Sequence, residues 1–439
     1  MTAALDPGIY RRRRERLAAA MQAGVAIMPT APERIRNRDA HFPYRFDSYF
    51  LYLTGFREPE AVVVVVAGAR PRHILFCRDK DPEREIWDGF RYGPEAARVT
   101  FGFDEAHSIH QLDALMPDLI ADCGTLHCHL GEDASWDARV TRWINEVRGR
   151  SRSGVTAPGE IRDVHAPLDE MRLVKGPEEL AVMRRAATIT AGAHRRAMRA
   201  SQAGRAEYEI EAELMHEFRR HGAQAPAYTP IVASGSRACV LHYVQNDGQL
   251  KDGDLLLIDA GCELDGYAAD VTRTFPVSGK FSGPQREVYD IVLAAQAAAI
   301  AQVKPGNRWD APHRAAVEVL AQGMIDLKLL QGGLAEAVET EAYKKYYMHR
   351  TGHWLGLDVH DAGDYKRNGE WRALAPGMVL TVEPGCYIRA GDGVPERFAG
   401  IGVRIEDDVA VTDAGAEVLT RDAPKQPADI EALMSARDA

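Results

Sequence analysis

Five side chains that can bind metal ions lie in the second half of this chain, each inside a short apolar segment. Apolar frames of this kind predict buried strands, and a carboxylate buried without a partner costs several kcal/mol. The sequence is therefore limited to folds that supply positive charge to these groups. They are Asp259 in LLLIDAG, Asp270 in GYAADVTRTF, His353 in HWLGLDVHD, Glu383 in LTVEPG and Glu406 in GVRIEDD.

Four carboxylates and one imidazole form a hard, oxygen-rich ligand set. Such a set suits Mn²⁺, Fe²⁺, Co²⁺ or Zn²⁺ better than a thiolate site would. It also holds too much negative charge for a single divalent ion. Two ions about 3.5–4 Å apart with a bridging water would balance the charge, and this arrangement hydrolyses stable bonds.

The spacing of the ligands predicts how they meet. We expect Asp259 and Asp270 on two strands joined by a tight hairpin at ELDGY, because Asp-Gly is a strong turn signal. Neighbouring strands lie about 5 Å apart, so both carboxylates would reach one metal pair. Glu383 and Glu406 are expected on a second strand pair, separated by an excursion rich in Gly and Pro, with His353 between the two halves.

Each of these residues taken singly has an ordinary structural explanation. An Asp at a strand end is usually a turn or cap residue, and a His between apolar neighbours is often a core residue. Glu406 followed by Asp407 and Asp408 also fits charge on a solvated strand edge. The five together, each at the polar point of a buried-looking strand, favour the metal site.

Charge and composition exclude several classes of function. The formal net charge is −10, which argues against binding of nucleic acid or an anionic membrane by the whole chain. The basic run Arg11 to Arg14 is predicted to be the solvated face of a first helix. No segment approaches the ~20 apolar residues of a membrane span, and no signal peptide is evident.

The cysteines carry no metal-binding pattern. Cys123, Cys128 and His129 come closest, but a fourth ligand is missing. Free thiols in a chain without a signal peptide predict a reducing, cytoplasmic location.

The length of 439 residues predicts two or three domains, and the element pattern predicts an α/β (α+β) fold. We place an α/β domain at 1–172 and a second domain at 173–439, with the loop 151–160 near the boundary. In the first domain we expect helices at 10–22, 110–122 and 136–150 and strands at 61–68 and 73–77. In the second we expect helices at 177–199, 206–221, 284–303 and 310–329, with strands around the ligands.

The ligand segments resemble the metallopeptidases of the pita-bread fold, which include methionine aminopeptidase, prolidase and aminopeptidase P. IDAGCELDGYAADVTRTFPVSGKF, HWLGLDVHD, GMVLTVEPGCYI and GIGVRIEDD all look like bacterial aminopeptidase P (Xaa-Pro aminopeptidase). FPYRFDSYFLYLTGFREPEAV (42–62) is similar to the signature of that family's N-terminal domain. The resemblance covers nearly the whole chain. It implies a creatinase-like N-terminal domain, with a role in substrate access or oligomerisation, and a catalytic domain of pseudo-two-fold symmetry.

The resemblance also implies roles for the ligands. Asp259 would chelate one ion with both oxygens, Asp270 and Glu406 would bridge the two ions, and His353 and Glu383 would complete the second. The implied cofactor is a pair of divalent ions, commonly Mn²⁺, with Co²⁺, Zn²⁺ or Fe²⁺ as alternatives.

Further side chains match substrate-cleft positions of that family. They are His242, His349 and His360, with Arg404 expected to neutralise the carboxylates or touch substrate. Trp87 resembles a position that reaches a neighbouring subunit's active site in tetrameric members. One departure is visible: Arg350 and Thr351 stand where aminopeptidase P often has Gly and a small or apolar residue.

The implied activity is release of the first residue from peptides with proline in the second position. A hydroxide bridging the ions would attack the first carbonyl, His360 and His242 would stabilise the oxyanion, and Glu383 would shuttle the proton. The partners expected are such peptides and further copies of the chain, as a homodimer or homotetramer.

Three alternatives remain at this stage. Prolidase, which takes only Xaa-Pro dipeptides, shares the ligand set. A pita-bread binding module that has lost activity and a metal-free creatinase-type amidinohydrolase are less compatible with the complete set of five ligands.

Overall fold

A computed structural model describes residues 6–391 and 393–436. The chain divides into two compact units between Met171 and Arg172, next to the boundary expected from the sequence. The division falls inside helix α7 (His165–Leu173) and not in the 151–160 loop. A helix of nine residues thus belongs partly to each unit.

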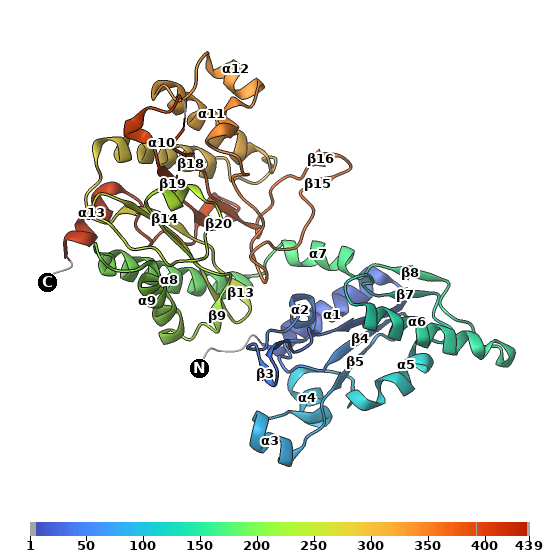
Figure 1. The fold of residues 1–439 in the computed structure, drawn as a ribbon. Helices are drawn as coiled ribbons and strands as arrows, with labels where there is room; N and C mark the ends of the chain where they lie inside the picture. The colour runs from blue at the N-terminus through green and yellow to red at the C-terminus, as the bar shows by residue number, and fades with distance from the viewer. Residues whose placement is uncertain (1–5, 392, 437–439) are drawn as a thin grey trace. The chain divides into compact units, whose positions relative to one another are not determined.

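The N-terminal unit is built on a six-stranded mixed sheet of order β6-β5-β4-β1-β7-β8 (Figure 1). Strands β1, β4 and β5 pair antiparallel, and the outer strands β6, β7 and β8 add in parallel. Its strands are β1 Gly24–Pro29, β2 Ile35–Asn37, β3 Ala40–His41, β4 Val62–Ala67, β5 Arg72–Cys77, β6 Glu105–Ser108, β7 Thr125–His127 and β8 Glu160–Arg162. Its helices before α7 are α1 Pro7–Met21, α2 Ser48–Thr54, α3 Pro82–Asp88, α4 Gly93–Phe101, α5 Leu112–Ile120 and α6 Ala134–Gly149.

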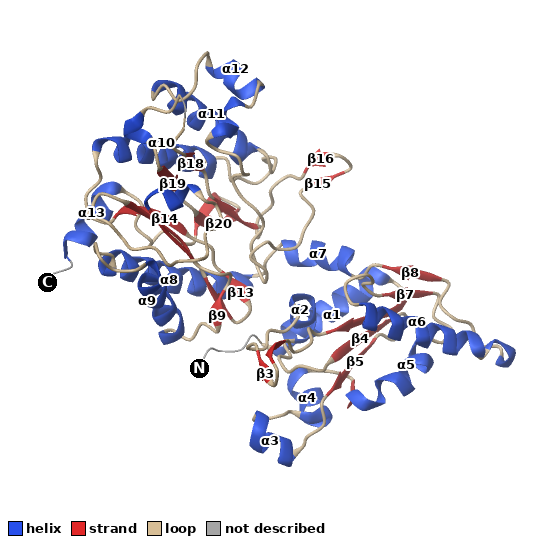
Figure 2. Ribbon diagram, in the orientation of Figure 1, coloured by secondary structure: helices blue, strands red, loops and turns tan. Residues whose placement is uncertain are grey.

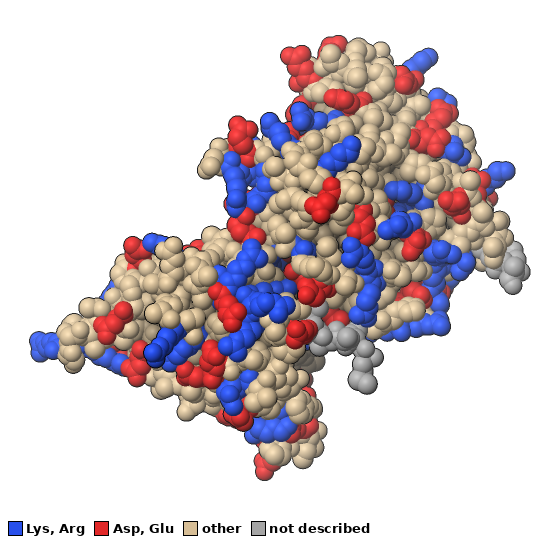
Figure 3. All heavy atoms as spheres, turned by 180° about the vertical axis from the view of Figure 1, so that it is seen from behind, with Lys and Arg blue, Asp and Glu red and all other residues tan. Residues whose placement is uncertain are grey.

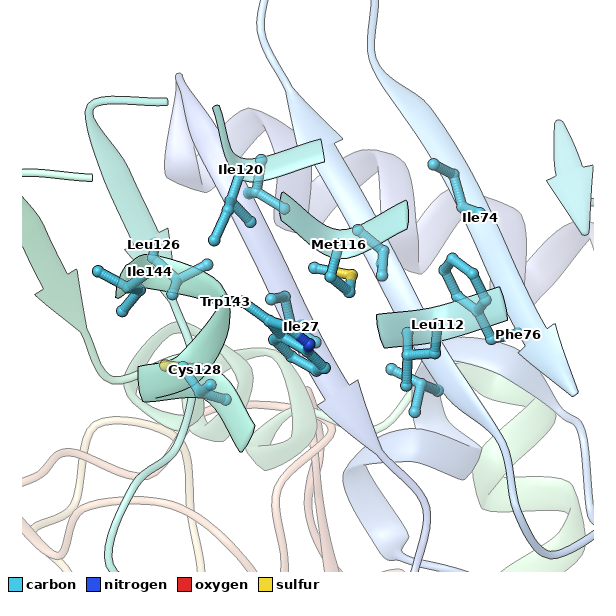
Figure 4. Packing of buried hydrophobic residues seen from close by; sticks show 14 of the residues in the cluster. Ile27, Ile74, Phe76, Leu112, Met116, Ile120, Leu126, Cys128, Trp143 and Ile144 are labelled. Carbon is cyan, nitrogen blue, oxygen red and sulfur yellow. The ribbon is translucent and has the colours of Figure 1, made fainter. Parts of the chain in front are cut away.

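The core of this unit forms where α5 and α6 cover the sheet. Met116 and Trp143 from the helices pack with Ile27 and Phe76 from the strands, and all four are fully or almost fully buried (Figure 4). The valine-rich β4 contributes Val62 and Val64 to the same cluster. Burial on this scale explains why the β-branched run at 62–66 folds as an inner strand.

Half of the basic run at the start of the chain lies on the predicted solvated face, because Arg11 and Arg12 are exposed on α1. Arg13 and Arg14 are buried on α1. Arg13 donates to the carbonyl of Tyr52 and stacks on its ring, with its guanidinium carbon 3.9 Å from the ring centroid. Arg14 donates to three backbone carbonyls in two other segments of the unit, those of Leu53, Phe101 and Gly102. These two arginines are structural donors and not a surface for anionic partners.

The C-terminal unit has two similar halves. Each half has a pair of packed helices and a three-stranded sheet: α8 packs with α9, which contacts β10 of the sheet β10-β11-β14, and α11 packs with α10, which contacts β17 of the sheet β17-β20-β21. Figures 1 and 2 show the two helix pairs on opposite sides of the strands. The helices are α8 Pro177–Ala200, α9 Glu207–Arg220, α10 Gly283–Ile300, α11 Ala311–Asp326, α12 Leu334–Glu339 and α13 Pro427–Ser435. The strands are β9 Ala225–Pro226, β10 Ile231–Ser234, β11 Leu255–Asp259, β12 Cys262–Leu264, β13 Tyr267–Ala268, β14 Thr272–Pro276, β15 Lys366–Arg367, β16 Glu370–Trp371, β17 Val379–Val382, β18 Gly385–Ile388, β19 Ile401–Arg404, β20 Asp407–Thr412 and β21 Gly415–Val418.

Local sequence signals explain where the helices of this unit begin. Pro177 is the first residue of α8, where its missing N–H costs nothing. The Glu179 carboxylate accepts a hydrogen bond of 2.9 Å from the N–H of Gly176, which satisfies one donor at the helix start. The predicted helix over 177–199 is thus confirmed.

The predicted hairpin at ELDGY forms and joins the two arms that we expected. Asp265 and Gly266 adopt positive φ values of 53° and 90° and connect the short strands β12 and β13. The same antiparallel register continues beyond these strands: Ala269 donates to the carbonyl of Cys262, Ala260 donates to that of Val271, and Asp259 of β11 lies opposite Thr272 of β14. The expectation that Asp259 and Asp270 lie on the two arms of one hairpin is therefore confirmed, although each arm is interrupted between its two strands.

Gly261 lies at the interruption of the first arm, between β11 and β12. A Cβ at this position would lie 1.7 Å from the carbonyl oxygen of Ala269, so the two backbone segments pass in contact. We expect Gly261→Ala to lower the free energy of unfolding by about 2 kcal/mol or more, because the backbone beside Asp259 must move apart. The matched change Gly283→Ala, at the open start of α10, meets nothing within 4 Å and should change it by less than about 0.5 kcal/mol. Denaturant unfolding measures both, and equal effects would contradict the close approach.

Candidate metal centre and cleft

The five predicted ligands lie where strands of the C-terminal unit end or begin. Asp259 is the last residue of β11, and Asp270 lies just before β14. Glu383 directly follows β17, and Glu406 fills the gap between β19 and β20. His353 lies in a loop whose backbone is fixed by hydrogen bonds with Thr381 of β17. Glu383 and Glu406 thus flank the strand pair on which we expected them.

Two backbone contacts join the two halves of the unit at these residues. The N–H of Glu406 donates to the carbonyl of Thr272 at 3.0 Å. The N–H of Asp270 donates to both oxygens of the Asp408 carboxylate, at 3.2 Å each. Strand ends from both halves therefore meet at one place, and their side chains converge there.

The converging atoms have the spacing of a metal site. One ligand atom each of Asp270, His353 and Glu406 lies within 4.8 Å of the other two. The His353 Nε2 atom lies 3.4 Å from an Asp270 oxygen and 3.6 Å from a Glu383 oxygen. The Tyr228 hydroxyl joins Asp259 to Asp270 at 2.6 and 2.5 Å. All five predicted ligands are thus brought together.

The electrostatics of this group call for cations. Burial first, and then the charges of Asp270 and Asp259, raise the pKa of Glu383 to about 7. Burial and the other three carboxylates raise the pKa of Glu406 well above its ordinary value. Burial works against a charged His353, but Asp270 and Glu383 outweigh it and raise its pKa to about 9. Hard oxygen donors with this excess of negative charge fit divalent metal ions.

Polar side chains that the sequence analysis missed orient the ligands. Thr272 donates to Glu406 at 2.7 Å, and Thr381 donates to Glu383 at 3.3 Å. Each threonine lies two positions from a ligand, Thr272 after Asp270 and Thr381 before Glu383, so the two-residue period of strands was a usable signal for both. Tyr228 lies 31 positions before Asp259, and no local pattern points to it.

Arg404 reaches the carboxylates as expected. Its guanidinium donates to Asp259 at 2.5 Å and to the hydroxyls of Tyr387 and Thr272 at 3.1 and 3.0 Å. The Tyr387 hydroxyl in turn lies 2.8 Å from Nε2 of His349. Because His349 Nδ1 lies 2.7 Å from the carbonyl of Arg350, we assign the proton to Nδ1, and Nε2 accepts from Tyr387. Burial and then the charge of Arg404 lower the pKa of His349 to about 3, so this imidazole is neutral.

The ligands open into a cleft of about 960 Å³. The cleft is lined by the three other predicted histidines, His242, His349 and His360, and by Arg404. The ring of His360 meets that of His353 edge-on, with centroids 4.4 Å apart. Of the two residues that depart from the resemblance, Arg350 lines the cleft. Thr351 is buried and contacts the Tyr347 hydroxyl at 2.6 Å.

The remaining predicted site residue lies in the N-terminal unit. Trp87 is near the end of α3, and its exposed fraction is 83%. The residues that line the cleft all come from the C-terminal unit. A role for Trp87 in substrate binding stays a prediction.

A second group with metal-ligand spacing includes His129, Asp163 and His165. The imidazoles of His129 and His165 are stacked, with centroids 4.0 Å apart and planes 17° apart. Ring-nitrogen lone pairs lie in the ring plane, so two stacked rings do not point at one ion. This group is not the Cys123–Cys128–His129 cluster weighed from the sequence, and we assign no metal to it.

Two further features concern nucleic acids and membranes as partners: the charge of the surface and the length of the apolar helices. On the face shown in Figure 3, Lys and Arg side chains are interspersed with Asp and Glu. Among the helices of the described residues, none is both long enough and apolar enough to cross a membrane.

This chain is similar to known metallopeptidases over nearly its whole length. The model of metallopeptidase family M24 matches residues 181–413, and that of the aminopeptidase P N-terminal domain matches residues 10–127. The Xaa-Pro aminopeptidase of Escherichia coli K12 is 45% identical over 97% of this chain and 97% of its own. The structure of Pseudomonas aeruginosa aminopeptidase PepP superposes with a TM-score of 0.97 at 50% identity, covering 98% of each chain. A zinc-substituted E. coli aminopeptidase P in complex with product gives a TM-score of 0.97 at 44% identity over 100% of both chains.

The residue after Glu406, Asp407, forms two ion pairs next to the metal ligands. Asp407 is buried and pairs with Arg273 at 2.7 Å and with Lys425 at 2.5 Å, so the alternative of solvated edge charge is wrong. Burial opposes its ionisation, but these two cations lower the pKa of Asp407 below its ordinary value.

We expect Asp407→Asn to lower the free energy of unfolding by about 3 kcal/mol or more, because Arg273 loses its buried counter-charge. A depressed carboxyl pKa stabilises the fold above the unfolded value of about 3.9 and stops doing so as the pH falls through the folded value. The stability difference from the parent should therefore be full at pH 7 and shrink only below about pH 4. Urea unfolding across this range measures it, with the exposed Asp422→Asn as the control. A difference that is unchanged between pH 7 and pH 3 would contradict the pairing.

Proposed function

This chain belongs to metallopeptidase family M24 and carries an aminopeptidase P N-terminal domain, and we propose that it releases the first residue from peptides with proline in the second position. The observation that carries the proposal is the convergence of Asp270, His353 and Glu406 within 4.8 Å at the floor of a substrate-sized cleft. The name of its E. coli relative supports the Xaa-Pro specificity.

We propose that Asp259, Asp270, His353, Glu383 and Glu406 hold two divalent ions. When bound, such ions lower the pKa of water and hold a free amino terminus, which accounts for exopeptidase action. Mn²⁺ is the ion that we expect, with Co²⁺, Zn²⁺ or Fe²⁺ as alternatives, and the zinc-substituted relative supports this range.

The chain's own residues supply the remaining chemistry. Glu383, tied to His353 at 3.6 Å, is our choice to take the proton of the attacking water and pass it to the prolyl nitrogen. His360, with His242 on the same cleft, would donate to the oxyanion that develops on the first carbonyl. The loss of one such donor typically costs about 10²–10³ in rate.

Recognition of proline depends on a pocket that fits the pyrrolidine ring, because an Xaa-Pro bond has no N–H that could donate a hydrogen bond to the enzyme. Hydrogen bonds from Arg404 to the buried Tyr387 hydroxyl and from this hydroxyl to His349 hold the two cleft-lining residues Arg404 and His349 in place. The neutral imidazole of His349 can border an apolar pyrrolidine ring without exposing a charge to it.

Two further expectations rest on the sequence. A homodimer or homotetramer, in which Trp87 would approach a neighbouring active site, stays a proposal. A cytoplasmic location likewise stays a prediction, supported by the free cysteines.

We expect Asp270→Ala and Glu406→Ala each to lose bound metal and at least about 10²-fold in kcat/KM on an Arg-Pro-Pro peptide. Asp364→Asn removes a carboxylate that also lines the cleft but is not tied to the ligand group, so its metal content should equal that of the parent. Elemental analysis and peptide hydrolysis measure the two effects. Parental metal content and hydrolysis in Glu406→Ala would remove the two-metal proposal.

The length of the accepted peptide separates this activity from prolidase. Cleavage of Xaa-Pro-Yaa tripeptides and longer peptides, stimulated by Mn²⁺ and abolished by a chelator, is the result that we expect. Hydrolysis of Xaa-Pro dipeptides alone would identify a prolidase instead.

A further inference from the structure

A pair of cations and one indole ring line the same cleft as the metal ligands. The three residues, which we call the Trp371 subsite, are Arg350, Lys366 and Trp371. We propose that the Trp371 subsite binds the free C-terminal carboxylate of a short peptide substrate. This inference rests on the proposed aminopeptidase function and adds to it a preference for short, free peptides.

The geometry gathers both cations around one ring. The Lys366 ammonium lies 4.4 Å from the centroid of the Trp371 ring, and the Arg350 guanidinium carbon lies 5.7 Å from it. Lys366 and Trp371 are cross-strand partners in the hairpin β15–β16, which Figure 1 shows at the tip of a long loop of the C-terminal unit. The ring face holds the cations by cation–π attraction and leaves their outer N–H groups for a ligand.

The positive charge of the subsite is available. Among the ion pairs between residues that the structure describes, none includes Arg350 or Lys366. Asp364 also lines the cleft but is exposed, and Glu370 of the same hairpin lies 4.0 Å from Arg308. A ligand carboxylate would therefore find two cations without a competing partner, and a guanidinium binds a carboxylate through two parallel hydrogen bonds.

The distance from the metal ligands suits a short peptide. Arg350 precedes the ligand His353 by three residues, so their Cα atoms are at most about 11 Å apart, at 3.3–3.6 Å per extended residue. An extended peptide covers that distance with about three residues. A carboxylate two or three residues beyond the scissile bond would thus come within reach of the Arg350 side chain.

The two charged regions of the cleft match the two ends of a free peptide. The acidic ligand group, with its ions, suits the amino terminus, and the Trp371 subsite suits the carboxyl terminus. Arg350 is also the cleft residue at which the sequence departs from the glycine common in the resembled family. An acidic side chain carries the same chemical group as a C-terminus, so the experiment must separate these two sources.

The experiment compares three substrates at equal ionic strength: Arg-Pro-Ala with a free carboxylate, its C-terminal amide, and Arg-Pro-Asp as the C-terminal amide. We expect the parent protein to prefer the free acid over the amide by about fivefold to tenfold in kcat/KM, mainly through KM. Arg350→Gly and Lys366→Ala should each bring this ratio towards one. The matched control Arg367→Ala removes a cation from the same hairpin that does not line the cleft, and it should keep the parental ratio.

The outcomes are distinct. A parent that cleaves the acid and the amide equally well, or an Arg367→Ala variant that loses the ratio as Arg350→Gly does, overturns the subsite while leaving the aminopeptidase proposal intact. An Asp amide that is cleaved as well as the free acid overturns the choice of the C-terminus. A parent that cleaves none of the three peptides defeats the proposed function itself. Thermal unfolding of each variant, expected to match the parent, separates loss of binding from loss of fold.

Discussion

The mutual repulsion of four carboxylates, of which Asp270 and Glu406 are buried and Asp259 and Glu383 are largely buried, is the constraint on which the C-terminal unit depends. Within the described structure, Arg404 alone offers these carboxylates an ion pair with a permanently charged side chain, at Asp259. The remaining negative charge is spread over Asp270, Glu383 and Glu406, and it is answered by His353 and by hydroxyl donors. Folding alone therefore leaves the site short of positive charge, and bound cations would complete both its chemistry and its stability.

The fold meets this constraint by breaking its strands at the ligands. In a continuous strand, the N–H groups of Asp270 and Glu406 would form hydrogen bonds within their own sheet. Because the strands stop there, these groups reach across to Asp408 and Thr272 of the other half. The ligand side chains at these strand ends converge on one place. Next to it, the ion pairs of Asp407 with Arg273 and Lys425 stabilise the start of β20. Position and support of the ligands thus come from one feature of the chain.

Sequence reasoning succeeded where the signal is local. Pro177 with its following glutamates fixes the start of α8, and the Asp265–Gly266 pair fixes a tight turn. It failed where a contact forms only in the folded chain. The turn predicts the long hairpin that carries Asp259 and Asp270, but no local pattern reveals that its arms are interrupted where Gly261 passes close to the carbonyl of Ala269. Tyr228 was missed for the same reason, since its hydroxyl meets Asp259 and Asp270 only in the folded chain.

Arg14 carries a consequence for the N-terminal unit. Its planar guanidinium donates hydrogen bonds to three carbonyls in two segments, which lie about forty and ninety residues further along the chain. Lysine, with a single ammonium group, could not present the same fork of donors. A polypeptide that began after α1 would leave these carbonyls without their donor, at about 1–3 kcal/mol for each buried group. The first helix is therefore an integral part of the unit, and a chain that lacks it would form a weakened domain.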